Sequence, residues 1–257
     1  MRTLAVTCLL ALGALVQSFP SAAQERPLPE PVSFYDAVRL NIVRAQREQN
    51  RYAYKERRTD LHTNPFGRIG TGGTRVLDVV PAPDGLTAMR RLIERDNMPI
   101  SDSAPERVNL PQRREGGGPR SVEDVTQTLR FTIARREVVS GHAVIVITFT
   151  PRPNARPTTR QGRLARNFTG NIWVNEAAQE VERVEATAVE DVSFGFGFVA
   201  RVRKGATVSA ERKPVEGGVW MPTSLRFIGE GRAMLFRKLD VNYATDWFDY
   251  RLVGATR

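Results

Sequence analysis

Alternating hydrophobic and polar positions, separated by short turns, fill the chain from Phe131 to Tyr250. Such alternation, bounded by Gly, Pro, Asn or Asp, is typical of β-strands. The pattern predicts a hairpin over 131–150 that turns at Ser140-Gly141, followed by strands at 170–175, 181–189, 192–204, 206–213, 220–228 and 232–243. This even succession predicts an antiparallel meander that curls towards a barrel.

The chain before this region carries a helical pattern and further strands. Apolar residues recur at helical spacing at Phe34, Val38, Ile42 and Ala45, and Ser33 is the expected N-cap. This apolar stripe fits two placements, docking on a sheet or covering the mouth of a cavity. Strands are expected at 51–58 and 74–80. Segment 88–95 fits either a helix or a hairpin, and the Asp96-Asn97 turn favours the hairpin.

A stretch rich in proline and glycine interrupts the pattern at about 101–120 and predicts a mobile loop. A short helix is expected over 121–129. Residues 24–32 are polar and proline-rich, which predicts a flexible segment. No internal repeat is found, so we expect residues 33–257 to form one domain.

Residues 1–23 have the layout of a secretory leader. Arg2 supplies the positive charge, 4–16 the apolar stretch, and 21–23 the small residues at a cleavage site. The apolar stretch is too short for a membrane span, which needs about 20 residues. The only cysteine, Cys8, lies inside this leader. We therefore expect a periplasmic or secreted protein that does not span the membrane after cleavage and whose fold relies on its core without disulfides.

Charge adds one partner class. The chain has a formal net charge of +10, and a basic surface attracts anions such as lipid headgroups. Anionic envelope components are therefore candidate partners, whereas a secreted location argues against nucleic acid. The alternative is that the arginines form an ordinary solvated surface.

The sequence offers little catalytic chemistry. His62 and His142 are far apart and lack metal-ligand spacing to another His or Cys, and there is no nucleophile elbow or P-loop. Glu180 and Glu182 alternate with apolar and basic residues, which predicts the solvent edge of a strand. We expect a protein that is not an enzyme and that needs no metal or cofactor.

The order of these segments resembles a known superfamily. It comprises an N-terminal helix, a tyrosine-bearing strand, an apolar strand ended by proline, Gly170 to Asn175 (G-N-I-W-V-N), and Gly218 to Pro222 (G-V-W-M-P). This order, over about 33–252, resembles the LolA/LolB-like periplasmic carriers that sort outer-membrane lipoproteins. The resemblance implies a mainly β (α+β) fold in which a curved antiparallel sheet forms an incomplete β-barrel. An N-terminal helix and short helices would cover its open side, and acyl chains would enter an apolar cavity.

Candidate cavity residues lie on the expected strands. Within S-F-G-F-G-F, the three phenylalanines share one strand face and the glycines the other. Ordinary core packing is the alternative for every candidate. The candidate ligand contacts are Phe194, Phe196, Phe198, Val144, Val146 and Trp173. A basic cluster at a strand end, the candidate anion contact, comprises Arg201, Arg203 and Lys204.

Two functions follow from this sequence. The first is a periplasmic carrier or binding protein for a hydrophobic or amphiphilic ligand, such as a lipid or the acyl chains of a lipoprotein. The second is a structural or interaction protein of the envelope, with the same fold but a barrel filled by its own side chains.

Overall fold

The computed structural model describes residues 26–60, 73–84, 87–109, 119–194, 200–233 and 237–254. The predicted leader, residues 1–23, lies outside this range. The helices are α2 (Pro31–Gln49), α3 (Pro119–Thr128) and α4 (Arg160–Ala165). The strands are β1 (Tyr52–Asp60), β2 (Thr74–Pro81), β3 (Thr87–Arg95), β4 (Met98–Pro99), β5 (Glu106–Asn109), β6 (Leu129–Val139), β7 (His142–Pro151), β8 (Phe168–Asn175), β9 (Glu180–Ala188), β10 (Val192–Phe194), β11 (Ala200–Val202), β12 (Thr207–Pro214), β13 (Trp220–Ala233) and β14 (Arg237–Leu252).

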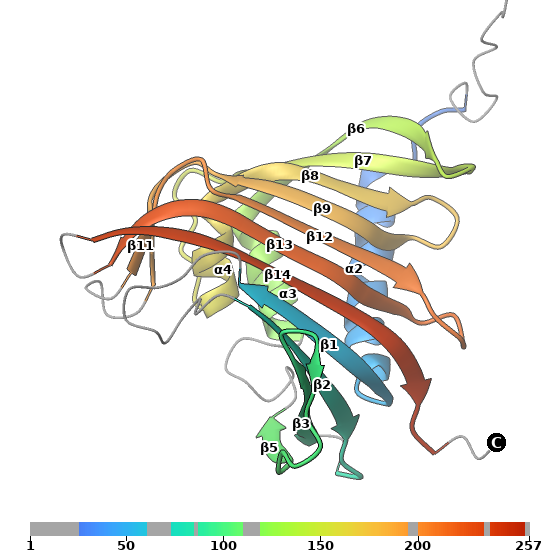
Figure 1. Cartoon of the computed structure of the whole chain (residues 1–257). Helices are drawn as coiled ribbons and strands as arrows, with labels where there is room; N and C mark the ends of the chain where they lie inside the picture. The colour runs from blue at the N-terminus through green and yellow to red at the C-terminus, as the bar shows by residue number, and fades with distance from the viewer. Residues whose placement is uncertain are drawn as a thin grey trace, which may run out of the picture.

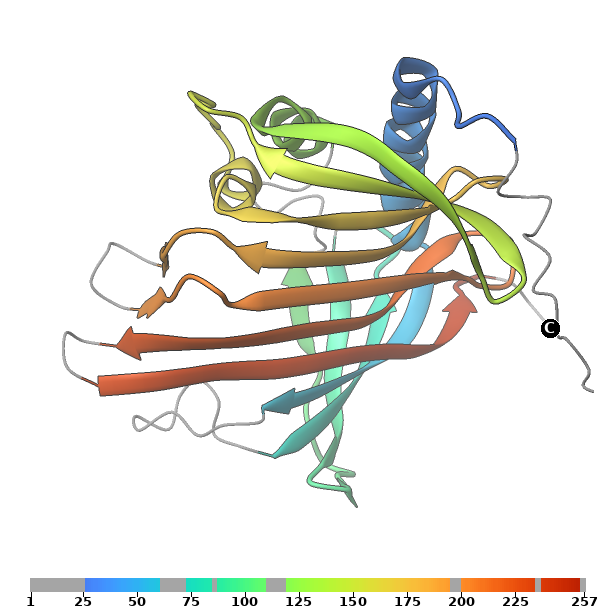
Figure 2. The ribbon, with the colours of Figure 1, turned by 90° about the horizontal axis from the view of Figure 1, so that it is seen from above.

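All the described strands belong to one 14-stranded antiparallel sheet. Its main path is β4-β3-β2-β1-β14-β13-β12-β9-β8-β7-β6, with β5, β10 and β11 attached beside it. The last strand, β14, pairs with β1 on one side and with β13 on the other. It thereby connects the N-terminal strands to the rest of the sheet. The sheet curves around the helices (Figures 1 and 2) and is open, because β4 and β6 are the ends of the path. The predicted mainly β, open and curved sheet with an N-terminal helix is confirmed.

Two predicted hairpin turns have the backbone that such turns require. Ser140 and Gly141 have φ of 50° and 84°, and Asp96 and Asn97 have φ of 50° and 63°. Positive φ at both central residues matches the right-handed twist of the strands they join. The hairpins β6–β7 and β3–β4 are therefore confirmed, and the helical alternative for 88–95 is wrong.

Helix α2 crosses one face of the sheet (Figure 1), and its apolar stripe is confirmed. Phe34 and Val38 pack against Ile145 and Ile147 of β7 in the main hydrophobic cluster. The predicted cap at Ser33 is wrong, because the helix begins earlier. The carboxylate of Glu30 accepts hydrogen bonds from the backbone N–H groups of the first turn, and proline occupies the start, where its missing N–H costs nothing.

Several segments differ from the sequence prediction. The predicted break between strands 220–228 and 232–243 is wrong, because β13 continues to Ala233 and β14 begins at Arg237. The predicted strand at 192–204 is two short strands, β10 and β11, which pair antiparallel with each other. The predicted loop at about 101–120 contains β5, which pairs with β3, and α3 begins at its end; 110–118 lie outside the described residues. Helix α4 was not predicted. Within the predicted flexible segment 24–32, the carbonyl oxygens of Arg26 and Pro27 accept hydrogen bonds from buried Arg136.

Candidate ligand cavity

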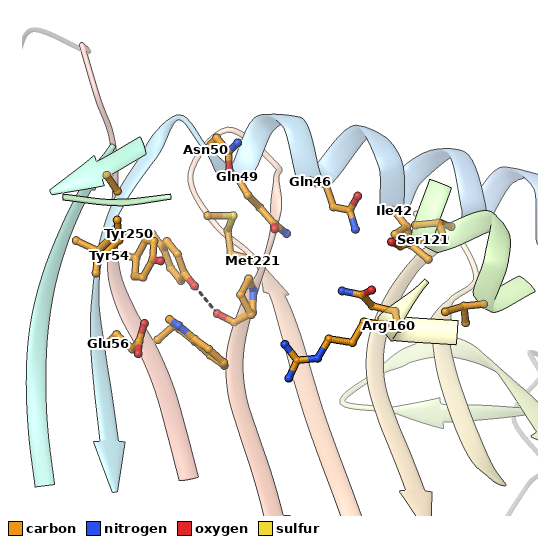
Figure 3. A pocket seen from close by; sticks show the side chains of 18 of the residues that line it. Ile42, Gln46, Gln49, Asn50, Tyr54, Glu56, Ser121, Arg160, Met221 and Tyr250 are labelled. Carbon is orange, nitrogen blue, oxygen red and sulfur yellow. Dashed lines mark hydrogen bonds between the residues drawn. The ribbon is translucent and has the colours of Figure 1, made fainter. Parts of the chain in front are cut away.

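A cavity of about 760 Å³ lies between the curved sheet and the three helices (Figure 3). The sheet contributes its floor and the helices its roof. The lining residues from the sheet are Tyr54, Glu56, Arg58, Val79, Ala88, Arg90, Val108, Phe131, Ile172, Met221, Pro222, Trp247 and Tyr250. Those from the helices are Ile42, Gln46, Gln49, Asn50, Ser121, Val122, Val125, Thr126, Arg160 and Gln161.

The two halves of α2 have different roles. The first half packs directly on β7, as the main hydrophobic cluster shows. The second half presents Gln46 and Gln49 to the cavity, and the C-cap residue Asn50 lies beside them. The Gln49 amide donates to the carbonyl oxygen of Trp220 at 2.9 Å, which fixes this end of the helix to β13. The predicted docking of the helix on the sheet is therefore confirmed, and its second half also lines the cavity.

Helices α3 and α4 are joined by a single buried carboxylate. Asp124 accepts from the backbone N–H groups of Thr158 and Thr159 at 3.0 and 2.9 Å, and from their hydroxyls at 3.3 and 2.6 Å. The Thr159 hydroxyl bond, with the backbone bonds and against an opposing burial effect, lowers the pKa of Asp124 to about 2. Gly162 lies so close to Asp124 that an added Cβ would be 2.1 Å from its Oδ2. This joint positions the α4 residues of the cavity wall.

Two tyrosines form an aromatic wall at the other end. The rings of Tyr54 on β1 and Tyr250 on β14 are 5.6 Å apart, and the Tyr250 hydroxyl donates to the carbonyl oxygen of Pro222 at 2.5 Å. Burial raises the pKa of Tyr54 to about 12, with a smaller contribution from nearby Glu56, and burial also raises the pKa of Tyr250. Both phenols are therefore neutral, and this end of the cavity is largely apolar.

The charged side chains at this end bind one another. Glu56 is buried, and its carboxylate accepts hydrogen bonds from Arg58 and, at 3.2 Å, from Arg90. Arg90 is itself mostly buried. A buried carboxylate needs such partners because desolvation of an unpaired charge is costly.

Three of the predicted contacts lie on the other face of the sheet. Directly paired residues of an antiparallel sheet share a face, and neighbours along a strand alternate. Ile145 faces α2, so Val144 and Val146 face away, and Trp173, paired with Val146, shares their side. The cavity receives other residues of these strands, such as Ile172. A ligand role for these three side chains stays a prediction.

The remaining predicted residues lie elsewhere or outside the described part of the chain. Phe196 and Phe198 are outside it, and so are the side chains of Phe194 and Arg201. Arg203 and Lys204 line a second hollow of about 600 Å³, together with Gly205, Ala206, Thr207, Ile228, Gly229, Glu230 and Asn242. Their predicted contact with an anion stays a prediction.

The acidic residues considered at the sequence level hold structural positions. Glu180 is buried, and its carboxylate accepts from Arg212 at 3.2 Å, so its expected place at a solvent edge is wrong. Glu182 lies 2.7 Å from His142 Nε2. In the described residues, no three His, Cys, Asp or Glu side chains gather as metal ligands would. No helix of the described chain is long and apolar enough to cross a membrane.

Comparison with known proteins gives structural neighbours only. No protein-family profile and no curated protein sequence matches the chain. An outer membrane lipoprotein-sorting protein domain from Vibrio parahaemolyticus is similar at 12% identity and a TM-score of 0.39, over 87% of this chain and 95% of that one. A LolA superfamily protein from Nitrosomonas europaea is similar at 14% identity and a TM-score of 0.33, over 83% and 92%. The lipoprotein LppX of Mycobacterium tuberculosis is similar at 11% identity and a TM-score of 0.25, over 84% and 95%.

Proposed function

We propose that this protein is a periplasmic or secreted binding protein or carrier, and not an enzyme, and that its cavity holds a hydrophobic or amphiphilic ligand such as a lipid or lipoprotein acyl chains. The observation that carries this proposal is the cavity of about 760 Å³ between sheet and helices. Sites for small molecules have volumes of about 300–1,000 Å³, apolar walls and a few polar groups.

The lining supports an apolar ligand. Phe131 and Ile172 are apolar lining residues from the sheet, and α3 contributes Val122 and Val125. Burying an acyl chain among such side chains gains about 0.8 kcal/mol for each methylene group removed from water. At the aromatic end Glu56 is paired with Arg58 and Arg90, and the rings of Tyr54 and Tyr250 supply the apolar surface.

A tryptophan in the cavity gives a direct test. Trp247 lines the cavity, whereas Trp173 lies on the other face of the sheet. Titration with a brominated fatty acid should quench tryptophan fluorescence, because bromine quenches on contact. Trp247→Phe should remove most of this quenching, and the matched control Trp173→Phe should keep it. Equal quenching in both variants would place the ligand elsewhere.

Filling the cavity provides the second test. Val125→Trp should block uptake of a fatty acid, detected by native mass spectrometry, because the larger side chain occupies the space between α3 and the sheet. Gln127→Trp, on the exposed side of the same helix, is the matched control. If neither variant nor the unaltered protein takes up the fatty acid, the interaction role with an unliganded barrel is the better account.

A further inference from the structure

The charged side chains of the cavity differ in their ion pairing. Three arginines line it, Arg58, Arg90 and Arg160, against one carboxylate, Glu56. Glu56 bonds the first two, at the tyrosine end. Arg160 has no ion-pair partner among the residues that the structure describes. Each end therefore has one positive charge in excess, but only at the helical end does it belong to a side chain with no ion-pair partner among the described residues.

Arg160 is exposed and lines the cavity where it opens to solvent. It begins the short helix α4, and Figure 3 shows its side chain reaching from the helix into the cavity, between Ser121 and Met221. The backbone of this segment is held by Asp124, which binds the two residues immediately before Arg160. The guanidinium thus extends from a fixed point.

Two further polar groups lie at the same end. Ser121 on α3 is only 6% exposed, and its hydroxyl oxygen is buried with no hydrogen-bond partner in the described chain. The amide oxygen of Gln161 is likewise buried without a partner there. Both residues line the cavity. A buried polar group without a partner costs about 1–3 kcal/mol, so these groups favour a ligand that supplies one.

The opposite end is suited to a hydrocarbon tail. Tyr54 and Tyr250 are neutral and buried, and Figure 3 places them across the cavity from Ser121 and Arg160. Val79, Ala88 and Val108 form an apolar cluster around Tyr54. One end therefore offers an arginine with no described ion-pair partner and a hydroxyl donor, and the other offers apolar and aromatic walls beside the ion-paired Glu56.

We propose that the helical end of the cavity is a head-group subsite for an anionic amphiphile, in which Arg160 binds a carboxylate or phosphate oxygen and the Ser121 hydroxyl donates to the same group. Gln161 accepts a hydrogen bond from a head-group hydroxyl or a water molecule. The tail extends towards the two tyrosines. This assignment rests on the proposed function and specifies the charge and the orientation of its ligand.

The test compares two ligands with similar alkyl chains, one with an anionic carboxylate head group and one with a neutral hydroxyl head group. Laurate and dodecanol both have twelve carbon atoms, and the affinity of each is measured by its displacement of the neutral probe N-phenyl-1-naphthylamine. The variants are Arg160→Gln, which removes the charge, and Arg160→Lys, which keeps it. Arg166→Gln, at the exposed end of the same helix, is the matched control. Circular dichroism of each variant establishes that it is folded.

Arg160→Gln should weaken laurate binding at least about tenfold, as expected for loss of a charge-assisted hydrogen bond, and should change dodecanol binding by less than about twofold. Arg160→Lys should retain part of the laurate affinity, and Arg166→Gln all of it. Ser121→Ala should weaken laurate binding several-fold without loss of stability, because it removes a buried hydroxyl.

The other outcomes are distinguishable. If laurate and dodecanol bind Arg160→Gln as tightly as the unaltered protein, the head-group subsite is overturned while the proposed function stands. If neither ligand binds the unaltered protein, the proposed function itself fails. Inorganic phosphate at millimolar concentration is the third arm. If it binds through Arg160 while laurate affinity does not depend on Arg160, the residue serves a free anion and the lipid assignment is overturned.

Discussion

Asp124 of α3 accepts hydrogen bonds from Thr158 and Thr159, the two residues before α4. Because these bonds all end on one carboxylate, the effect of removing them can be predicted quantitatively. Asp124→Ala should destabilise the protein by about 3 kcal/mol. The two shortest bonds, both with Thr159 at 2.6 and 2.9 Å, account for most of this, since a hydrogen bond to a charged group contributes about 1.5–3 kcal/mol. In a chain of this size, each kcal/mol lowers the melting temperature by about 2–4 °C, so a fall of about 6–12 °C is expected.

The dependence on pH follows from the lowered pKa. Asp124 has a pKa of about 2 in the folded protein against an ordinary value of 3.8. A lowered carboxyl pKa stabilises the folded state above the unfolded pKa, and that stabilisation is lost as pH falls through the folded pKa. The difference in stability between the unaltered protein and Asp124→Asn should therefore shrink by about 1–2 kcal/mol as pH falls from about 5 to about 2.

Urea unfolding followed by circular dichroism measures both effects. Glu123→Gln is the matched control, because Glu123 is half-exposed and neighbours Asp124 on the same helix. This control should change the free energy of unfolding by less than about 0.5 kcal/mol. The reasoning is refuted if Asp124→Ala unfolds at the midpoint of the unaltered protein, or if the difference from Asp124→Asn stays constant over this pH range.

Three more substitutions test the packing around the cavity. Gly170→Ala should cost at least about 2 kcal/mol in urea unfolding, because its Cβ would lie 1.9 Å from the carbonyl oxygen of Glu185; an unchanged midpoint would contradict the close approach of β8 and β9. Phe34→Ala should lower the unfolding free energy by about 3–5 kcal/mol by leaving a cavity under α2, and a thermal melt that shows a loss below about 1 kcal/mol would argue against that packing. Glu56→Gln should cost about 2 kcal/mol in urea unfolding by leaving Arg90 without its carboxylate, whereas a neutral result would mean that solvent replaces this partner.

The fold followed from the sequence where local chemistry determines it. The turns at Ser140-Gly141 and Asp96-Asn97 have residues that tolerate positive φ, so both hairpins were predicted. The apolar stripe of α2 likewise predicted a helix packed on a sheet. Helix α4 was missed because its six residues, R-Q-G-R-L-A, have no apolar period, and a hydrogen bond from Gly162 to Thr159 and the distant Asp124 hold it instead.

The site was harder to predict, because distant strands assemble it. Tyr54 and Tyr250 meet only since β14 returns beside β1. Strand β7 is apolar at Val144, Ile145 and Val146 alike, and a strand buried on both faces carries no signal of which face is concave. The charge of Glu180 predicted a solvent-exposed position. In the structure Glu180 is buried, where its partner is Arg212 from another strand. The sequence around the polar and tyrosine residues of the cavity contains no motif that marks them as cavity residues.

The central claim is that the cavity carries an amphiphile, and native mass spectrometry of gently purified protein tests it most directly. The protein should retain a bound mass that organic solvent releases as an acyl lipid, or it should take up laurate stoichiometrically when emptied, with Val125→Trp failing in both respects. A protein that is empty as isolated, and that stays empty in excess laurate and dodecanol, would contradict the account.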